Sequence, residues 1–307
     1  MPAVALTVAR LIGSSDENLA IAQAFAPWGV PLYVAALAIL GALLGRRATV
    51  GPRRRPVAAA CLVLVTGLAL HLWWLAPSLV GSAPPAADGA PRLTVMSTNI
   101  LLGQADTEDV LGEVVDRDVD LLFVQEITAE ALARLEEGGI GDLLPHRAGE
   151  PKPGATGTMV FSRTPITDVA PIATGTDSWV LSTAGLRTIA VHPAYPLHDE
   201  WGAEQELLRE VIEAEDPDLV VGDFNSGHDH APFRAILDTG LRDAAELVGA
   251  GWQPTWPVGG FRGIPIPTSV AIDHVLVGER LTALSTETTE IDGADHLALV
   301  AEVAERD

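Results

Sequence analysis

The chain has 307 residues, which is enough for one large domain with an appendage or for two ordinary domains. Hydrophobic residues make up 48% of the chain and its mean hydropathy is +0.27, which is too apolar for an average soluble enzyme and directs attention to membrane segments. Cys61 is the only cysteine, so a disulfide framework and a cysteine-based zinc site are both excluded within one chain.

The formal net charge is −22, and it is unevenly distributed. The first 87 residues contain two of the 41 acids and six of the 19 bases, so residues 88–307 contain 39 acids and 13 bases, a net charge of −26. Nucleic-acid-binding proteins usually carry a basic surface, because binding neutralises phosphates. The acidic charge therefore argues against a long nucleic-acid substrate and indicates a solvated, solubilising surface.

Two long apolar segments, about 24–45 and 57–78, are each long enough to cross about 30 Å of hydrocarbon as a helix. The short loop between them contains five arginines and no acid, so the positive-inside rule places it in the cytoplasm. We therefore expect a multi-pass protein of the cell membrane, anchored in the lipid bilayer by these helices, with the rest of the chain on the extracytoplasmic side. A buried helical hairpin within a soluble protein is the alternative. Residues 1–13 are also apolar, which leaves a further span open.

The expected organisation is a membrane region over residues 1–80, a Pro/Ala-rich linker over 81–91 and a catalytic domain over 92–307. In the last region, apolar runs and amphipathic patterns alternate along the chain. Strands are expected at 93–99, 120–125, 156–162, 187–192, 219–222, 272–277 and 297–303. Helices are expected at 107–117, 128–137 and 203–214, and from Pro232 to Gly240.

Five polar side chains lie at the ends of four of these apolar strands: Asn99, Glu126, His192, Asp223 and Asn225. Layered α/β proteins commonly build their sites at strand ends, so one shared site is predicted. Two later Asp-His pairs, Asp273-His274 and Asp295-His296, supply further carboxylates and imidazoles. This set of residues suits metal-assisted hydrolysis of a phosphoester.

The motifs Ser-Thr-Asn99, Val-Gln-Glu126, Val-His192-Pro, Gly-Asp223-Phe-Asn225, Ile-Asp273-His and Ala-Asp295-His296 occur in an order that resembles the endonuclease/exonuclease/phosphatase superfamily. The resemblance covers about residues 92–303, and the tract Gly251–Pro257 is similar to a bacterial branch that often carries membrane helices. It implies a four-layer α/β/β/α sandwich of the type I deoxyribonuclease kind, preceded here by the N-terminal transmembrane hairpin. Ala294 and Val191 stand where many members have Ser and Thr, which leaves the substrate open.

The resemblance implies a divalent metal, usually Mg²⁺, with Mn²⁺ as the other candidate. Glu126 would be the principal metal carboxylate, with Asn99 beside it and Asp295 near the same ion. Hard oxygen donors of this kind suit both ions, which keep water ligands for exchange with substrate.

The resemblance also implies catalytic roles for five residues. Asp223 would orient or deprotonate the attacking water, and Asn225 would donate to a phosphate oxygen. His296 would contact the scissile phosphate while Asp273 holds its ring, and His192 would be a second imidazole facing the phosphate.

Other polar residues receive structural interpretations. His274 should point to the strand face opposite Asp273, which indicates a structural role. His228 and His230 have the appearance of a metal cluster, but solvation in a loop is the expectation adopted for them. Trp252 and Trp256 are candidates either for stacking on a substrate or for packing.

The sequence thus predicts a membrane-anchored, metal-dependent phosphoesterase acting on a phosphodiester or phosphomonoester. Its expected substrate is a small molecule or a lipid headgroup rather than a long nucleic acid. The alternatives are a metal-dependent nuclease acting on DNA or RNA and a non-catalytic anchored binding module.

Overall fold

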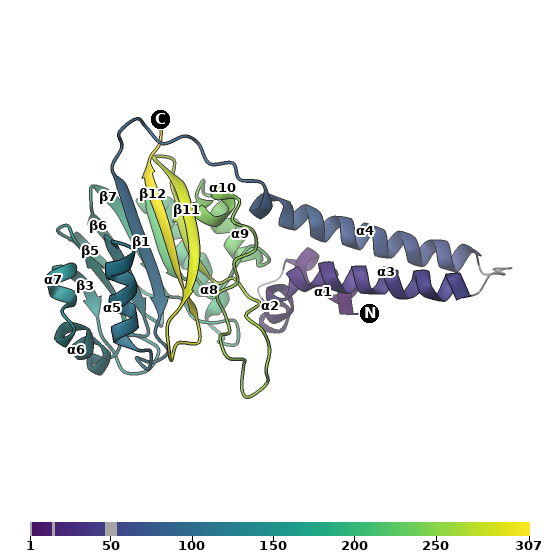
Figure 1. Ribbon diagram of the computed structural model, residues 1–307, viewed down its shortest axis with the longest axis horizontal. Coiled ribbons are helices and arrows are strands. Elements are labelled where there is room, and N and C mark those ends of the chain that lie inside the picture. Colours follow the sequence, from purple (N-terminus) through teal and green to yellow (C-terminus); the bar gives the residue numbers. More distant parts are fainter. Residues whose placement is uncertain (1, 14–15, 47–53) are drawn as a thin grey trace.

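The computed structural model describes residues 2–13, 16–46 and 54–307. Two six-stranded sheets form the centre of the C-terminal domain (Figure 1). In spatial order, the first sheet contains β11 (Leu281–Glu290), β12 (Leu297–Glu305), β1 (Arg92–Asn99), β2 (Leu121–Gln125), β4 (Thr158–Ser162) and β3 (His146–Glu150). The second contains β5 (Thr167–Ile172), β6 (Ser178–Thr183), β7 (Leu186–Val191), β8 (Leu219–Asp223), β10 (Asp273–Val277) and β9 (Arg242–Asp243).

Three apolar cores separate four layers. One core joins the outer face of the first sheet to α5 (Thr107–Asp116), α6 (Ala129–Glu137) and α7 (Ile140–Leu143). A second core, which includes Phe123 and Val221, lies between the two sheets. The third joins the second sheet to α8 (Trp201–Glu215) and α9 (Ala231–Leu237). The predicted α/β/β/α sandwich is therefore confirmed.

Local sequence explains where the layers' helices begin. The Asp106 side chain accepts a hydrogen bond from the Glu108 amide at the start of α5, and Thr128 accepts one from the Ala131 amide at the start of α6. The central strands β2 and β8 are buried throughout, as expected for strands covered on both faces.

The topology brings several strand ends to one edge of the sandwich. β1 and β2 are parallel in the first sheet, and β7 and β8 are parallel in the second, so the carboxyl ends of each pair meet at the same edge. β10 is antiparallel to β8 with Asp273 opposite Asp223, and β12 is antiparallel to β1. The first residues of β10 and β12 therefore lie at the edge where β8 and β1 end.

The N-terminal region is helical, with α1 (Pro2–Ile12), α2 (Glu17–Ala24), α3 (Gly29–Arg46) and α4 (Arg54–Leu79). The predicted helix over 24–45 begins later than expected, because a 3₁₀-turn containing Pro27 separates α2 from α3. Two segments, Ala26–Gly45 and Arg55–Leu79, are long and apolar enough to cross a membrane, and only 11% and 17% of their apolar windows are buried. The hairpin of α3 and α4 projects from the sandwich (Figure 1). Its low burial disfavours the soluble-core alternative. The arginine-rich loop includes residues 47–53, which lie outside the described residues.

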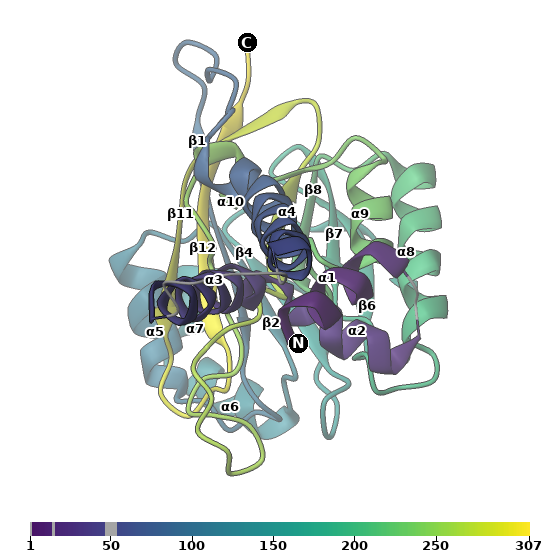
Figure 2. The same cartoon turned by 90° about the vertical axis from the view of Figure 1, so that its right-hand side faces the viewer.

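The N-terminal helices contact the side of the sandwich that faces the viewer in Figure 2, where α3 and α4 are seen end-on. Arg10 of α1 forms an ion pair with Asp229 (Nε to Oδ1, 3.1 Å) and lies over the Trp74 ring. The His230 ring is 2.9 Å from the Ala20 carbonyl oxygen. The contacts to Asp229 and His230 both reach the loop that follows β8.

The segment between α4 and β1, residues 80–91, lies along the sandwich rather than free of it (Figure 1). The amides of Ser82 and Ala83 both donate to the Leu247 carbonyl oxygen, and the Ala87 amide donates to Glu305. Thr282 Oγ1 also donates to the Pro84 carbonyl oxygen, at 2.7 Å. The expected linker is thus hydrogen-bonded to the domain at several points.

Candidate active site

Asp223 and Asp273 form the centre of the polar cluster at the shared strand edge. They are register partners on β8 and β10, and both side chains are buried. The Asp273 carboxylate lies 2.8 Å from His296 Nδ1, which holds the imidazole with its Nε2 turned toward Asp223, 3.8 Å from Oδ2. The predicted Asp273–His296 pair is therefore present in the geometry.

His192 also lies close to Asp223. Its Nε2 is 3.8 Å from Asp223 Oδ2, so two imidazoles approach the same carboxylate oxygen. The His192 Nδ1 atom is buried and has no hydrogen-bond partner among the described residues. The backbone of His192 is fixed, since its amide donates to Ser178 Oγ.

Asn99 links the two sheets across this edge. Its Nδ2 donates to Asp223 Oδ2 (3.1 Å) on the second sheet and to Glu126 Oε1 (3.2 Å) on the first. Its Oδ1 accepts from the Leu101 amide. In this orientation the amide nitrogen faces the carboxylates and holds them together.

Glu126 follows β2 in a left-handed backbone conformation, with φ of +60°. Non-glycine residues rarely adopt this conformation, and it is concentrated at functional sites. The Leu102 amide donates to Glu126 Oε2 at 2.7 Å, so both carboxylate oxygens have a defined orientation.

Asp295 marks the side on which the cluster is open to solvent. Its side chain is 32% exposed, whereas those of Asp223 and His296 are nearly inaccessible. Trp256 Nε1 donates to Asp295 Oδ2 at 3.2 Å, and Asp295 Oδ1 lies 4.0 Å from His296 Nε2. Trp256 thus has a direct contact with the site, in addition to packing edge-on against Phe261.

Asn225 borders the cluster, but its side chain is engaged elsewhere. Its backbone is left-handed (φ +48°), its amide donates to Asp223 Oδ1, and its Nδ2 donates to the Pro193 carbonyl oxygen at 3.0 Å. Asn225 therefore ties the β7 and β8 exits together. One Nδ2 hydrogen bond joins it to the backbone beside His192.

Burial and neighbouring charges shift the protonation of these groups in opposite directions. Burial, together with the nearby Asp273 carboxylate, raises the pKa of Asp223 to about 7. Burial disfavours a charged His296, but the carboxylates of Asp273 and Asp223 prevail and raise its pKa to about 10. Burial, assisted by the charge of His296, lowers the pKa of His192 to about 4. At neutral pH the site therefore contains one cationic and one neutral imidazole.

The donor set fits a hard divalent cation. Burial raises the pKa of Glu126, and the nearby Asp295 carboxylate also raises it, as expected where two acids share a space that a cation would neutralise. The buried Asp273 Oδ1 has no hydrogen-bond partner within the described part of the chain. Side-chain atoms of Asp223, Asp273 and His296 also lie within 4.8 Å of one another, and the donors are mainly oxygens.

Sequence reasoning missed several supporting groups. Thr255 Oγ1 accepts a hydrogen bond from the Asp273 amide, and the Val258 amide donates to the Asp295 carbonyl oxygen. The segment after Gly251 therefore fixes the backbone of two site residues. Leu102 contributes a backbone donor from a loop whose sequence gives no sign of that role.

The expectation that His228 and His230 are solvated loop residues is wrong. His230 is 1% exposed, and its Nδ1 accepts from the Gly227 amide. The His228 ring bonds to Asp243 at 2.9 Å. Both rings are held by tertiary contacts because the loop after β8 is covered by α1, α2 and α9.

The model of the Endonuclease/Exonuclease/phosphatase family matches residues 96–296, and the chain belongs to this family. This membership and the site together define a hydrolase that acts on ester bonds. No curated protein matches the sequence.

Solved structures share the fold at low sequence identity. A 3′ phosphatase, NExo, from Neisseria, bound to a product DNA hairpin, is 18% identical with a TM-score of 0.55, over 70% of this chain and 99% of that one. An AP endonuclease from Archaeoglobus fulgidus is 13% identical with a TM-score of 0.56, over 68% and 98%. D. rerio TDP2, complexed with single-strand DNA product, is 14% identical with a TM-score of 0.55, over 69% and 98%.

Proposed function

We propose that this chain is a membrane-anchored, divalent-metal-dependent phosphoesterase whose substrate is a small phosphoester or a lipid headgroup. The observation that carries the proposal is the convergence of Asp223 with His192 and His296, each 3.8 Å from the same carboxylate oxygen. A carboxylate beside two imidazoles offers a proton acceptor and two contacts for a phosphate.

The protonation states support distinct roles for these three residues. Asp223, with a pKa of about 7, is suited to accept the proton of an attacking water at neutral pH. His296, with a pKa of about 10, carries a positive charge that stabilises negative charge on the phosphate oxygens. Neutral His192 can donate one hydrogen bond without adding charge.

Mg²⁺, or Mn²⁺ in its place, would be held by Glu126 and Asp295, with Asn99 beside them. When bound, such an ion supplies Lewis-acid polarisation of the phosphoryl oxygen. Asn99 keeps the Glu126 and Asp223 carboxylates at a fixed separation through its two hydrogen bonds. We assign Asp273 the role of orienting His296 and Asn225 that of fixing the Asp223 loop, with its second N–H directed to a phosphate oxygen.

Membrane anchoring rests on α3 and α4. Their large apolar side chains are exposed along the hairpin, including Leu62 (68%) and Ile39 (62%), as expected of lipid-facing surfaces. Trp28 and Trp73 are also exposed near one end, where an interfacial belt is expected. With the arginine-rich loop in the cytoplasm, the catalytic domain would lie on the extracytoplasmic side.

Exposed apolar residues beside the site support an amphiphilic substrate. Leu102, whose amide contacts Glu126, is 43% exposed, and Tyr195 and Leu197, in the loop after His192, are 53% and 42% exposed. Together with the net charge of −26 over residues 88–307, this surface favours a lipid or small phosphoester over a polyanion.

The test is hydrolysis by the purified full chain in detergent, using a chromogenic phosphodiester, a chromogenic phosphomonoester and phospholipid vesicles. Turnover should need Mg²⁺ or Mn²⁺ and stop in EDTA. Asp223→Ala and His296→Ala should each lower kcat by about 10²–10⁴-fold, because each removes a proton-transfer or charge-stabilising group. Asp142→Ala, an exposed acid in α7, is the matched control and should be unaffected.

Unchanged turnover in EDTA would reject the metal-dependent mechanism. Nuclease activity is the second candidate, because related folds bind DNA products. Efficient nicking of plasmid DNA at physiological salt, with weak phospholipid hydrolysis, would favour it. If the purified chain bound neither Mg²⁺ nor Mn²⁺ and showed no turnover, the result would indicate a non-catalytic binding module.

A further inference from the structure

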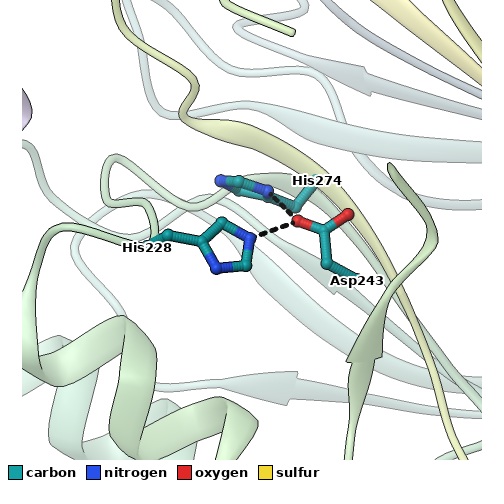
Figure 3. A group of neighbouring side chains, drawn as sticks. All are labelled: His228, Asp243 and His274. Carbon is teal, nitrogen blue, oxygen red and sulfur yellow. Dashed lines mark hydrogen bonds and ion pairs between the residues drawn. The ribbon is translucent and has the colours of Figure 1, made fainter. Parts of the chain in front are cut away.

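A second cluster of metal-ligating side chains lies outside the catalytic site and is formed by His228, Asp243 and His274 (Figure 3). His228 is in the loop between β8 and α9, Asp243 ends β9, and His274 is on β10. Asp243 Oδ2 lies 2.9 Å from His228 Nε2 and 2.7 Å from His274 Nδ1, so one oxygen atom faces both imidazoles.

This cluster is separate from the catalytic residues although His274 follows Asp273 in sequence. Successive side chains of a strand point to opposite faces. The Asp273 carboxylate bonds to His296, whereas the His274 ring bonds to Asp243 and lies 4.3 Å from the Phe233 ring. The two clusters thus use opposite faces of β10.

The rings are oriented by their surroundings. Glu246, in the first turn of α10 (Ala244–Val248), has Oε1 3.3 Å from His228 Nδ1, which directs Nε2 of that ring toward Asp243. A carboxylate on the remaining nitrogen is the usual partner of a metal-bound histidine. Asp243 is fixed as well, because its Oδ1 accepts from the Ala245 amide as the N-cap of α10.

The site is largely buried and borders a cavity. The side chains of Asp243 and His274 are 3% and 4% exposed, and His228 is 29% exposed. A cavity of about 90 Å³ between the sandwich and the N-terminal helices is lined by all three residues. Its lining also includes the acids Asp229, Glu246 and Asp273 against one arginine, Arg10, which is already paired with Asp229. The cavity therefore favours a cation.

The nitrogen and oxygen donors are of the type that zinc accepts. Zinc–ligand distances of about 2.0–2.1 Å place tetrahedral ligand atoms about 3.3 Å apart. The present separations of 2.7 and 2.9 Å need to open by about half an ångström to reach that value. His274 Nε2 is buried with no hydrogen-bond partner in the described ranges, so no second hydrogen bond opposes such a shift of the ring.

We propose that His228, Asp243 and His274 bind one zinc-class divalent ion through two imidazole nitrogens and one carboxylate oxygen, with the fourth position open to the cavity. The ion links the loop after β8 to β10 and α10. The same loop receives Arg10 and the Ala20 carbonyl group from the N-terminal helices, so the ion stabilises the surface on which those helices pack.

The experiment is Zn²⁺ titration of the full chain in detergent, after chelator treatment and in excess Mg²⁺, followed by calorimetry and by competition with a chromogenic chelator. One tight equivalent is expected. His228→Asn and Asp243→Asn should each weaken it by more than about 100-fold, since loss of an outer carboxylate alone costs about 10–100-fold. Glu246→Gln, which alters an outer carboxylate, should weaken zinc binding by about 10–100-fold. Asn at position 243 keeps a side-chain acceptor for the α10 cap.

Two controls separate this ion from the catalytic one. His146→Asn removes a histidine of β3 outside the cluster, and Glu126→Gln alters the catalytic carboxylate, so both should keep the tight equivalent. Zn²⁺ should also raise the Tm of the wild type and not that of His228→Asn. Absence of a tight equivalent in the wild type, full affinity in His228→Asn, or loss of it in Glu126→Gln would overturn the proposal, whatever the phosphoesterase assays give.

Discussion

At the scale of single residues, the catalytic cluster depends on carboxylates that have different environments. Asp273 bonds to the His296 imidazole at 2.8 Å, whereas Asp223 lies 3.8 Å from both His192 and His296 and has its pKa raised to about 7 by burial and the Asp273 carboxylate. Different environments move the pKa values of like groups apart and thereby give them different roles. The assignment of base and cation therefore follows from position, not from residue type.

The pH dependence of kcat/KM should consequently be bell-shaped. Activity should rise as Asp223 loses its proton near pH 7 and fall as His296 loses its proton near pH 10. Asp273→Asn removes the carboxylate that most raises the His296 pKa, so the alkaline limb should move to lower pH. A bound cation shifts the acid limb to lower pH, because it stabilises the ionised carboxylate. The profiles should therefore be measured at several Mg²⁺ concentrations.

The control for this profile is Asp142→Asn, which should leave both limbs in place. An alkaline limb that stays fixed in Asp273→Asn would show that His296 is not the group responsible for it.

At the scale of secondary-structure elements, β8 positions Asp223 by close packing of its backbone. Gly222 has φ of +147°, and a Cβ atom there would lie 2.1 Å from the Val191 carbonyl oxygen of the parallel strand β7. A backbone oxygen cannot yield without separating the two strands, so only glycine fits directly before Asp223.

Gly222→Ala should therefore lower both activity and stability. We expect a fall in kcat of at least about 10²-fold, because even a 1 Å misplacement of a catalytic group has that cost, together with a lower Tm. Gly112→Ala is the matched control, since Gly112 is exposed in α5 with open space around its Cβ position. It should stabilise the helix by about 0.5–1 kcal/mol. Normal kinetics in Gly222→Ala would contradict the packing argument.

The elements that sequence predicted are the buried ones. Continuous apolar runs identified β2, β4, β8 and β10 to within a few residues, and the polar residues after them indicated the shared edge. The strands that were missed outright are mostly at or near sheet edges, where one face or both meets solvent. β5 is exposed at five of its six positions, and the second half of β11 reads Ser-Thr-Glu-Thr-Thr-Glu, so neither has a continuous apolar pattern.

The candidate site, too, could be predicted from the sequence only where a local pattern marks its residues. Strand exits located Asn99, Glu126 and Asp223, because topology alone brings strand ends together. The His228–Asp243–His274 cluster joins three segments through a loop fold and a two-residue strand, which no local pattern encodes. A loop position predicts solvation for His228 and His230, whereas the structure holds both rings by tertiary contacts.

At the scale of the whole molecule, the orientation of the chain in the membrane is open to a direct test. In a Cys61→Ala background, a cysteine at Asp168, in exposed β5, should react with a membrane-impermeant maleimide in intact cells. A cysteine at Thr49, in the arginine-rich loop, should react only after permeabilisation. Labelling in the opposite order would place the catalytic domain in the cytoplasm.

Residues 80–91 have a consequence for substrate choice. This segment is hydrogen-bonded to Leu247 and Glu305, and α1 is ion-paired to the loop after β8, so the N-terminal helices and the catalytic domain are joined at several points. With α3 and α4 in a bilayer, as we propose, this attachment would hold the reactive centre at a fixed height above it. Substrates would then be sorted by how far their phosphorus stands from the lipid tails, before any side chain recognises their chemistry.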